Sequence, residues 1–118
     1  MAAFTTADRD AWHWTLLIRQ PPPVTAAMAT DAIVTTAARR LTAGDRVRFD
    51  ILDEGTTAQV VHRGPYRDEA PTIARLHRFV ADHGLVEVGR HHEIYLSDPR
   101  RVAPERMRRI IRQPVGPR

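Results

Sequence analysis

A carboxylate lies in the middle of a short β-prone segment near the C-terminus, His91-His92-Glu93-Ile94-Tyr95-Leu96. Successive side chains of a strand point to opposite faces, so alternation groups His91, Glu93 and Tyr95, and leaves Ile94 and Leu96 for the core. A carboxylate in such a strand is either solvated on an open face or held in a pocket, where it binds a cation or transfers a proton. Glu93 and Tyr95 are therefore the candidate catalytic pair. The alternative is an exposed Glu beside a partly buried Tyr.

Aromatic and imidazole side chains provide a candidate ligand-binding set. Trp12 and Trp14 share one face of a β-like segment and could stack on a planar or cationic ligand, or could be ordinary core tryptophans. His62 and Tyr66 flank the Gly64-Pro65 turn. They could edge a pocket, or Tyr66 could stand at a helix entrance with His62 solvated. The predicted ligand-binding residues are Trp12, Trp14, His62, Tyr66 and His91.

Several kinds of chemistry are excluded by composition. The chain of 118 residues has no cysteine, and all 18 of its basic residues other than histidine are arginine. Disulfides, thiolate ligands, cysteine nucleophiles and lysine Schiff bases are therefore excluded. His91 and His92 point apart on a strand, and His77 and His83 are spaced too far apart on a helix to chelate one ion. We predict no metal and no cofactor, and Ser97 lacks the context of a nucleophile.

Net charge is +4, and the most basic stretch carries Arg100, Arg101, Arg106, Arg108, Arg109 and Arg112. No aromatic residue is interleaved with these arginines, and no helix-turn-helix pattern is present. We expect a solvated or salt-bridged surface and no specific nucleic-acid partner. The N-terminus lacks the pattern of a secretion signal, and no apolar run reaches bilayer length, so we expect a cytoplasmic protein without membrane contact.

The first half of the chain predicts a strand, a helix and then two strands that form a hairpin. A strand over residues 11–19 stops at three prolines, and a helix with Thr25 as N-cap runs to about Leu41, where Gly44 closes it. Apolar alternation predicts a half-buried strand over residues 47–51. After a turn at residues 53–55, its hairpin partner covers residues 57–62.

The second half predicts a helix from near Asp68 or Pro71 to His83, with Ile73, Leu76, Phe79 and Val80 buried and Gly84 at its end. Short strands over residues 86–88 and 93–96 follow, with Gly89 as a bend between them. Pro104 begins a short helix, residues 109–115 form the last strand, and residues 116–118 are expected to be loose. The pattern is α+β, a mainly antiparallel sheet with helices packed on one face.

Three sequence segments resemble the GyrI-like small-molecule-binding proteins. These are the strand end Glu93-Ile94-Tyr95-Leu96-Ser97-Asp98-Pro99, the strand and turn over residues 58–66 that end in His62-Arg63-Gly64-Pro65-Tyr66, and the strand over residues 12–21 that begins with Trp12-His13-Trp14. The resemblance covers the chain from about Asp8 and implies an SHS2-type fold built from two strand-helix-strand-strand modules. It implies one full module over residues 46–115 plus the final strand of the other. Residues 1–118 would then be a single domain that lacks its N-terminal part.

The same resemblance implies two functions. One branch of the family hydrolyses cyclopropane-bearing alkylating natural products, which makes Glu93 a general base and the protein a metal-independent hydrolase in detoxification. The alternative is a non-catalytic binder or sensor of hydrophobic or cationic planar compounds. In both cases the partner is a small aromatic ligand. Because a partial domain leaves sheet edges and the tryptophan face uncovered, we also expect a homodimer.

Overall fold

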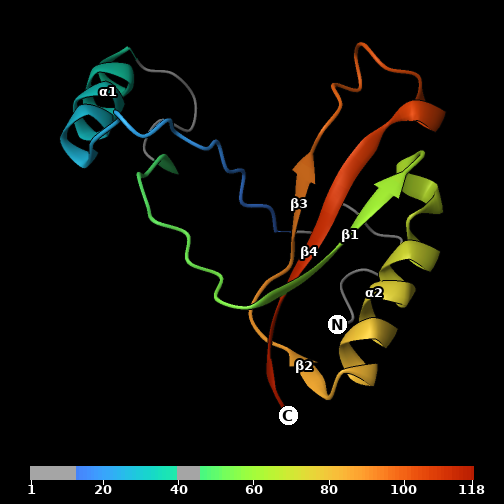
Figure 1. Ribbon diagram of the computed structural model, residues 1–118. Coiled ribbons are helices and arrows are strands. Elements are labelled where there is room, and N and C mark those ends of the chain that lie inside the picture. The colour runs from blue at the N-terminus through green and yellow to red at the C-terminus, as the bar shows by residue number, and fades with distance from the viewer. Residues whose placement is uncertain (1–12, 40–45) are drawn as a thin grey trace. The chain divides into compact units, whose positions relative to one another are not determined.

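The computed structural model describes residues 13–39 and 46–118, which fall into two compact units, Met1–Ile51 and Leu52–Arg118 (Figure 1). We describe each unit by itself. Of the helices in the described part of the chain, none combines the length and hydrophobicity needed to cross a bilayer.

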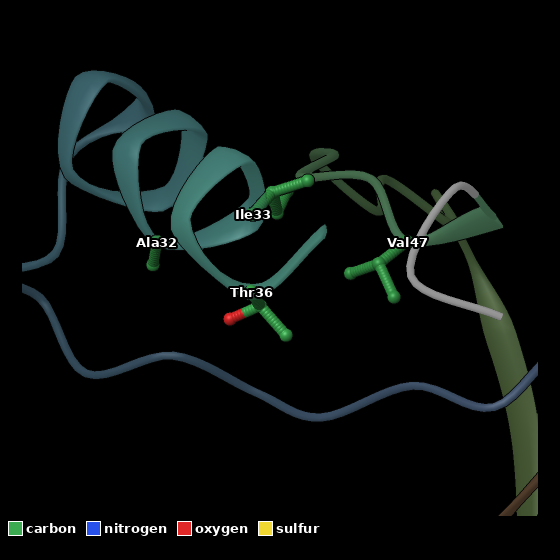
Figure 2. Close-up of a pocket in the computed structure, with 4 residues that line it drawn as sticks. All are labelled: Ala32, Ile33, Thr36 and Val47. Atoms are coloured by element: carbon green, nitrogen blue, oxygen red, sulfur yellow. The ribbon is translucent and has the colours of Figure 1, made fainter. Parts of the chain in front are cut away.

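The first unit contains helix α1, Ala26–Ala38. The prediction of its start is confirmed, because the Thr25 hydroxyl accepts a hydrogen bond from the Met28 backbone N–H at 3.2 Å. The predicted end near Leu41 and the closing Gly44 lie outside the described residues. No side chain of α1 is buried. Together with Val47 the helix forms a shallow recess of about 210 Å³, lined by Ala32, Ile33 and Thr36 (Figure 2). None of the side chains that line this recess is titratable.

Two predicted strands are wrong in the first unit. Residues 13–19 of the predicted strand 11–19 form no strand, and its residues 11 and 12 lie outside the described residues. Residues 47–51 form no strand either, and Leu16, Ile18 and Ile51 are 88%, 85% and 87% exposed. Alternating β-branched and aromatic residues fit a pleated, half-buried surface, but a strand also needs a partner for its backbone groups. None of the strand pairings in the described residues involves either segment.

The second unit is built on a four-stranded antiparallel sheet, which confirms the α+β fold (Figure 1). Its strands are β1 (Thr57–Arg63), β2 (Leu85–Glu87), β3 (His92–Tyr95) and β4 (Arg108–Pro117). The long strand β4 lies at the centre and pairs with β1 on one edge. On its other edge it pairs with β3 and then with β2. The predicted strand over residues 57–62 is thus confirmed, but its partner is β4 instead of residues 47–51.

Helix α2, Ala70–Asp82, follows a short 3-10 turn at Tyr66–Asp68 and confirms the second predicted helix. The helix ends as its sequence indicates. The backbone N–H of His83 donates to the Phe79 carbonyl, and the N–H of Gly84 donates to that of Ala81, with Gly84 at a φ of +67°. Gly89, at a φ of +64°, is the bend between β2 and β3, which lets both strands follow the same edge of β4.

The core lies between α2 and one face of the sheet. Its buried side chains are Ala58, Leu76, Val80, Ile111 and Val115, with Ile73 partly buried beside them. Phe79 is 50% exposed, so its predicted burial is wrong. The expectation of a loose C-terminus is also wrong, because Gly116 and Pro117 pair with Val86 and Leu85 of β2.

This core predicts a stability difference between the two faces of the sheet. Ile111 is 2% exposed on the face that packs against α2, whereas Val61 is 53% exposed. Ile111→Ala should lower the free energy of unfolding by about 2–5 kcal/mol, and Val61→Ala by less than about 1 kcal/mol. Urea unfolding followed by circular dichroism measures both values. Equal losses for the two variants would contradict this arrangement.

Candidate functional site

A buried arginine stands at the centre of the candidate site. Arg109 in β4 is 1% exposed, and its Nε lies 2.6 Å from Oε1 of Glu69 and 3.5 Å from Oε2 of Glu93. The expectation that Arg109 belongs to a solvated basic surface is therefore wrong. A buried guanidinium is stable only when carboxylates compensate its charge, and here two do so.

Strand register brings Glu93 to this arginine. Tyr95 is opposite Arg109, and Glu93 is opposite the core residue Ile111, so both point to the face that α2 covers. Ile94 pairs with Ile110 and takes the opposite face, and Leu96 is 47% exposed. The expectation that Ile94 and Leu96 face the core is therefore wrong. The Glu93 side chain is 12% exposed, which fits the interpretation of a sheltered carboxylate.

Glu69 is the second carboxylate, and sequence reasoning missed it together with Arg109. It occupies the N-cap position of α2, where the positive end of the helix dipole favours a negative charge. Forty positions separate Glu69 from Arg109 along the chain. A signal was available only for Arg109, because alternation from Ile111 and Val115 along β4 places residue 109 on the core face.

Two tyrosines complete the cluster. The guanidinium carbon of Arg109 lies 3.9 Å from the ring centroid of Tyr66, a cation–π contact. The rings of Tyr66 and Tyr95 meet edge to face, with centroids 6.4 Å apart. Both Glu93 and Tyr66 act on the Tyr95 hydroxyl and raise its pKa. The predicted residues Glu93, Tyr95 and Tyr66 are thus brought together around Arg109.

The electrostatics of the cluster distinguish Glu93 from its neighbours. Burial raises the pKa of Glu93, and the nearby Glu69 charge raises it further, while Arg109 opposes the change. Burial and the Glu93 charge also raise the pKa of the Tyr95 hydroxyl, which therefore stays protonated and can donate a hydrogen bond. Glu93 can take up a proton more readily than an ordinary glutamate, as a general base must.

His62 has a supporting position. It is 4% exposed, so the alternative of a solvated His62 is wrong. Its Nε2 lies 3.2 Å from the carbonyl oxygen of Pro65, which can only accept, so Nε2 carries the hydrogen. Its Nδ1 lies 2.9 Å from the hydroxyl of Thr72. Both ring nitrogens are therefore engaged, and His62 ties β1 to the turn before α2.

The remaining predicted ligand-binding residues have different surroundings. Burial lowers the pKa of His91 to about 4, with further contributions from the charges of His77, His92 and Arg90, so this imidazole is neutral at pH 7. Trp14 is 62% exposed in the first unit, and Trp12 lies outside the described residues. No group of three His, Asp or Glu side chains within residues 13–39 and 46–118 could hold a metal ion.

Comparisons with known proteins identify relatives of the chain. A family model for the GyrI-like small molecule binding domain matches residues 18–113. A crystal structure of a hydrolase from Listeria innocua is 38% identical with a TM-score of 0.80, covering 92% of this chain and 58% of that one. A second structure, an uncharacterized conserved protein from the same organism, is 39% identical with a TM-score of 0.72, covering 83% and 50%. The chain therefore corresponds to between 50% and 58% of the length of these two proteins. No curated protein matches it.

The buried ion cluster predicts a pH-dependent effect of removing its cation. In Arg109→Gln, Glu69 and Glu93 lose their counter-charge, and the variant should be less stable by about 3–5 kcal/mol at pH 7. The pKa of Glu93, already raised by burial, rises further without Arg109, so the folded variant binds more protons than the unfolded chain and its stability falls as pH rises through that window. The loss should therefore be smaller at pH 5 than at pH 7.

Urea unfolding at both pH values measures this difference. Arg100→Gln is the matched control, because Arg100 pairs with Asp98 at 3.0 Å but its side chain is 87% exposed. The control should lose little stability at either pH. A loss for Arg109→Gln that is equal at pH 5 and pH 7 would show that the two carboxylates do not depend on it.

Proposed function

The chain belongs to the GyrI-like small-molecule-binding family, and on this premise we propose that it binds small, flat aromatic or cationic compounds beside Glu93 and hydrolyses those that bear an activated cyclopropane. The observation that carries the proposal is the sheltered Glu93 carboxylate, which is 12% exposed, contacts Arg109 and has a raised pKa. The description of one structural relative as a hydrolase supports the catalytic part.

The proposed reaction needs only one general base. Glu93 accepts a proton from a water molecule as the water oxygen attacks a ring carbon of the strained cyclopropane. The new C–O bond forms while a ring C–C bond breaks, and the electron pair passes to the conjugated carbonyl of the substrate, which then takes up a proton. Tyr95 stays protonated and orients Glu93 through its hydroxyl. Arg109 and Glu69 hold the carboxylate in place and set its proton affinity.

In this proposal, aromatic side chains provide most of the contact area with the ligand. Tyr66 and Tyr95 already lie beside the carboxylate, and we propose that Trp12 and Trp14 supply a stacking wall. His62 holds the Gly64-Pro65 turn at the edge of this site, and the neutral His91 offers a hydrogen bond without adding a charge.

A non-catalytic binder or sensor is the second candidate. It is favoured by the contact between Glu93 and Arg109, because the cation opposes the rise in pKa that burial gives this carboxylate and so weakens it as a base. A cationic ligand would then share Glu93 with Arg109. Turnover distinguishes the two functions, since a sensor binds the compound and releases it unchanged.

Replacing Glu93 tests the catalytic role. Glu93→Gln should lower the rate of cyclopropane hydrolysis by about 10²–10⁴-fold, because it removes the general base, and should leave binding of the ring-opened product largely intact. Trp12→Ala and Trp14→Ala should instead weaken binding through lost contact area. Glu105→Gln, at an exposed position in the 3-10 helix Pro104–Arg106, is the charge-matched control.

Chromatographic assay of substrate loss and fluorescence titration measure rate and binding. In the native protein the rate should fall as pH decreases, because protonation removes the base. The midpoint should lie above the ordinary glutamate pKa, since the pKa of Glu93 is raised. If Glu93→Gln matches the Glu105→Gln control in both assays, the assignment of the site is wrong. Binding by the native protein without any turnover would establish the sensor instead.

We also propose that two chains associate as a homodimer. Edge strands present unpaired backbone groups, and apolar side chains on the sheet are exposed, with Val61 at 53% and Leu96 at 47%. Pairing of such surfaces in a symmetric dimer would cover them. Light scattering after size-exclusion chromatography should give twice the mass of 13.4 kDa. A monomer at tens of micromolar protein would contradict the proposal.

A further inference from the structure

Three arginines converge on a polar recess on the side of the second unit where β1 and β4 meet the loop before β4. The recess has a volume of about 300 Å³ and is lined by Arg63, Arg106 and Arg108, together with Ser97 and Val102. Neither Glu93 nor any other acidic residue lines it. It is therefore separate from the cluster around Arg109.

Strand register forces two of these cations together. Arg63 of β1 lies directly opposite Arg108 of β4, and like charges at directly opposed positions destabilise a sheet. Acidic side chains offset four other arginines of this unit, because Arg67 pairs with Asp68, Arg100 with Asp98, Arg109 with Glu69, and Arg112 with Glu54. Among the described residues, no ion pair is formed by Arg63, Arg106 or Arg108. Their positive charge is thus concentrated without internal compensation.

The surrounding loop supplies a further donor. The Ser97 hydroxyl oxygen accepts a hydrogen bond from the backbone N–H of Arg108 at 3.1 Å, so its own hydrogen can be donated to a ligand. The loop is held by Asp98, whose carbonyl accepts from the N–H groups of Arg101 and Val102. The backbone N–H of Gly64 donates to the Met107 carbonyl at 2.9 Å and fastens the loop to the end of β1.

We propose that this recess binds a phosphate group, either inorganic phosphate or the phosphate of a small monoester. Three guanidinium groups and a hydroxyl match a tetrahedral dianion, whose oxygens can accept from several directions, better than a planar carboxylate. The bound dianion would offset the repulsion between Arg63 and Arg108. No aromatic side chain lines the recess to stack on a base, so the ligand is a small phosphate compound and not a nucleic-acid strand.

The repulsion gives the proposal an unusual test, because removing either cation should stabilise the ligand-free protein. Arg63→Gln and Arg108→Gln should unfold at a temperature equal to or above that of the native protein in chloride buffer. Inorganic phosphate should raise the unfolding temperature of the native protein above that in chloride at equal ionic strength. Each variant should bind phosphate about tenfold more weakly, since each loses charge-assisted hydrogen bonds.

The matched control is Arg78→Gln, which removes one positive charge from an exposed position of α2 and should change the phosphate affinity by less than about twofold. Calorimetric titrations with inorganic phosphate and with glycerol 3-phosphate give the affinities, and Ser97→Ala provides an independent weakening variant. Binding of either compound that depends on Arg63 and Arg108 supports the site and identifies which form it accepts. Chloride giving the same stabilisation, or variants no weaker than Arg78→Gln, would overturn the proposal.

Discussion

The burial of Arg109 is the constraint on which the second unit depends. A guanidinium taken out of water costs several kcal/mol unless carboxylates and hydrogen bonds replace its hydration. Glu69 at the start of α2 and Glu93 in β3 provide this compensation from two sides, and Tyr66 covers the cation with its ring. The start of the helix, the register of β3 and the centre of β4 are therefore fixed relative to one another by one charge.

The same constraint explains the chemistry available at Glu93. Two carboxylates share one guanidinium, and the shorter contact, 2.6 Å, belongs to Glu69. Burial and the nearby charge of Glu69 raise the pKa of Glu93, and its longer contact with Arg109, 3.5 Å, opposes this change without cancelling it. The pair thus divides its roles, because Glu69 compensates the cation and Glu93 remains able to exchange a proton.

The features that were predicted correctly from the sequence are those that interactions between neighbouring residues determine. The N-cap of α1 at Thr25, the C-terminal end of α2 at Gly84 and the bend at Gly89 were each predicted from a few neighbouring residues. The same is true of the strands β1, β3 and β4. The strands predicted over residues 11–19 and 47–51 are wrong where the structure describes them, because alternation cannot show whether a partner strand is present. Arg109 was missed for a related reason. One arginine in a run of basic residues looks like surface, and only its pairing with Glu69 and Glu93, set by tertiary structure, makes its burial stable.

Alternation along β4 places the side chains of the adjacent residues Arg108 and Arg109 on opposite faces of the sheet. Arg109 points to the face covered by α2, where two carboxylates neutralise it within the fold. Arg108 points the opposite way, beside Arg63, where no described acidic side chain offsets it. The charge of Arg109, which is 1% exposed, is compensated by carboxylates of the protein itself, whereas the charge of Arg108 lies where solutes can reach it. The strand β4 therefore carries two adjacent cations with different surroundings. Arg109 is part of the interior of the fold, and Arg108 is accessible to solutes.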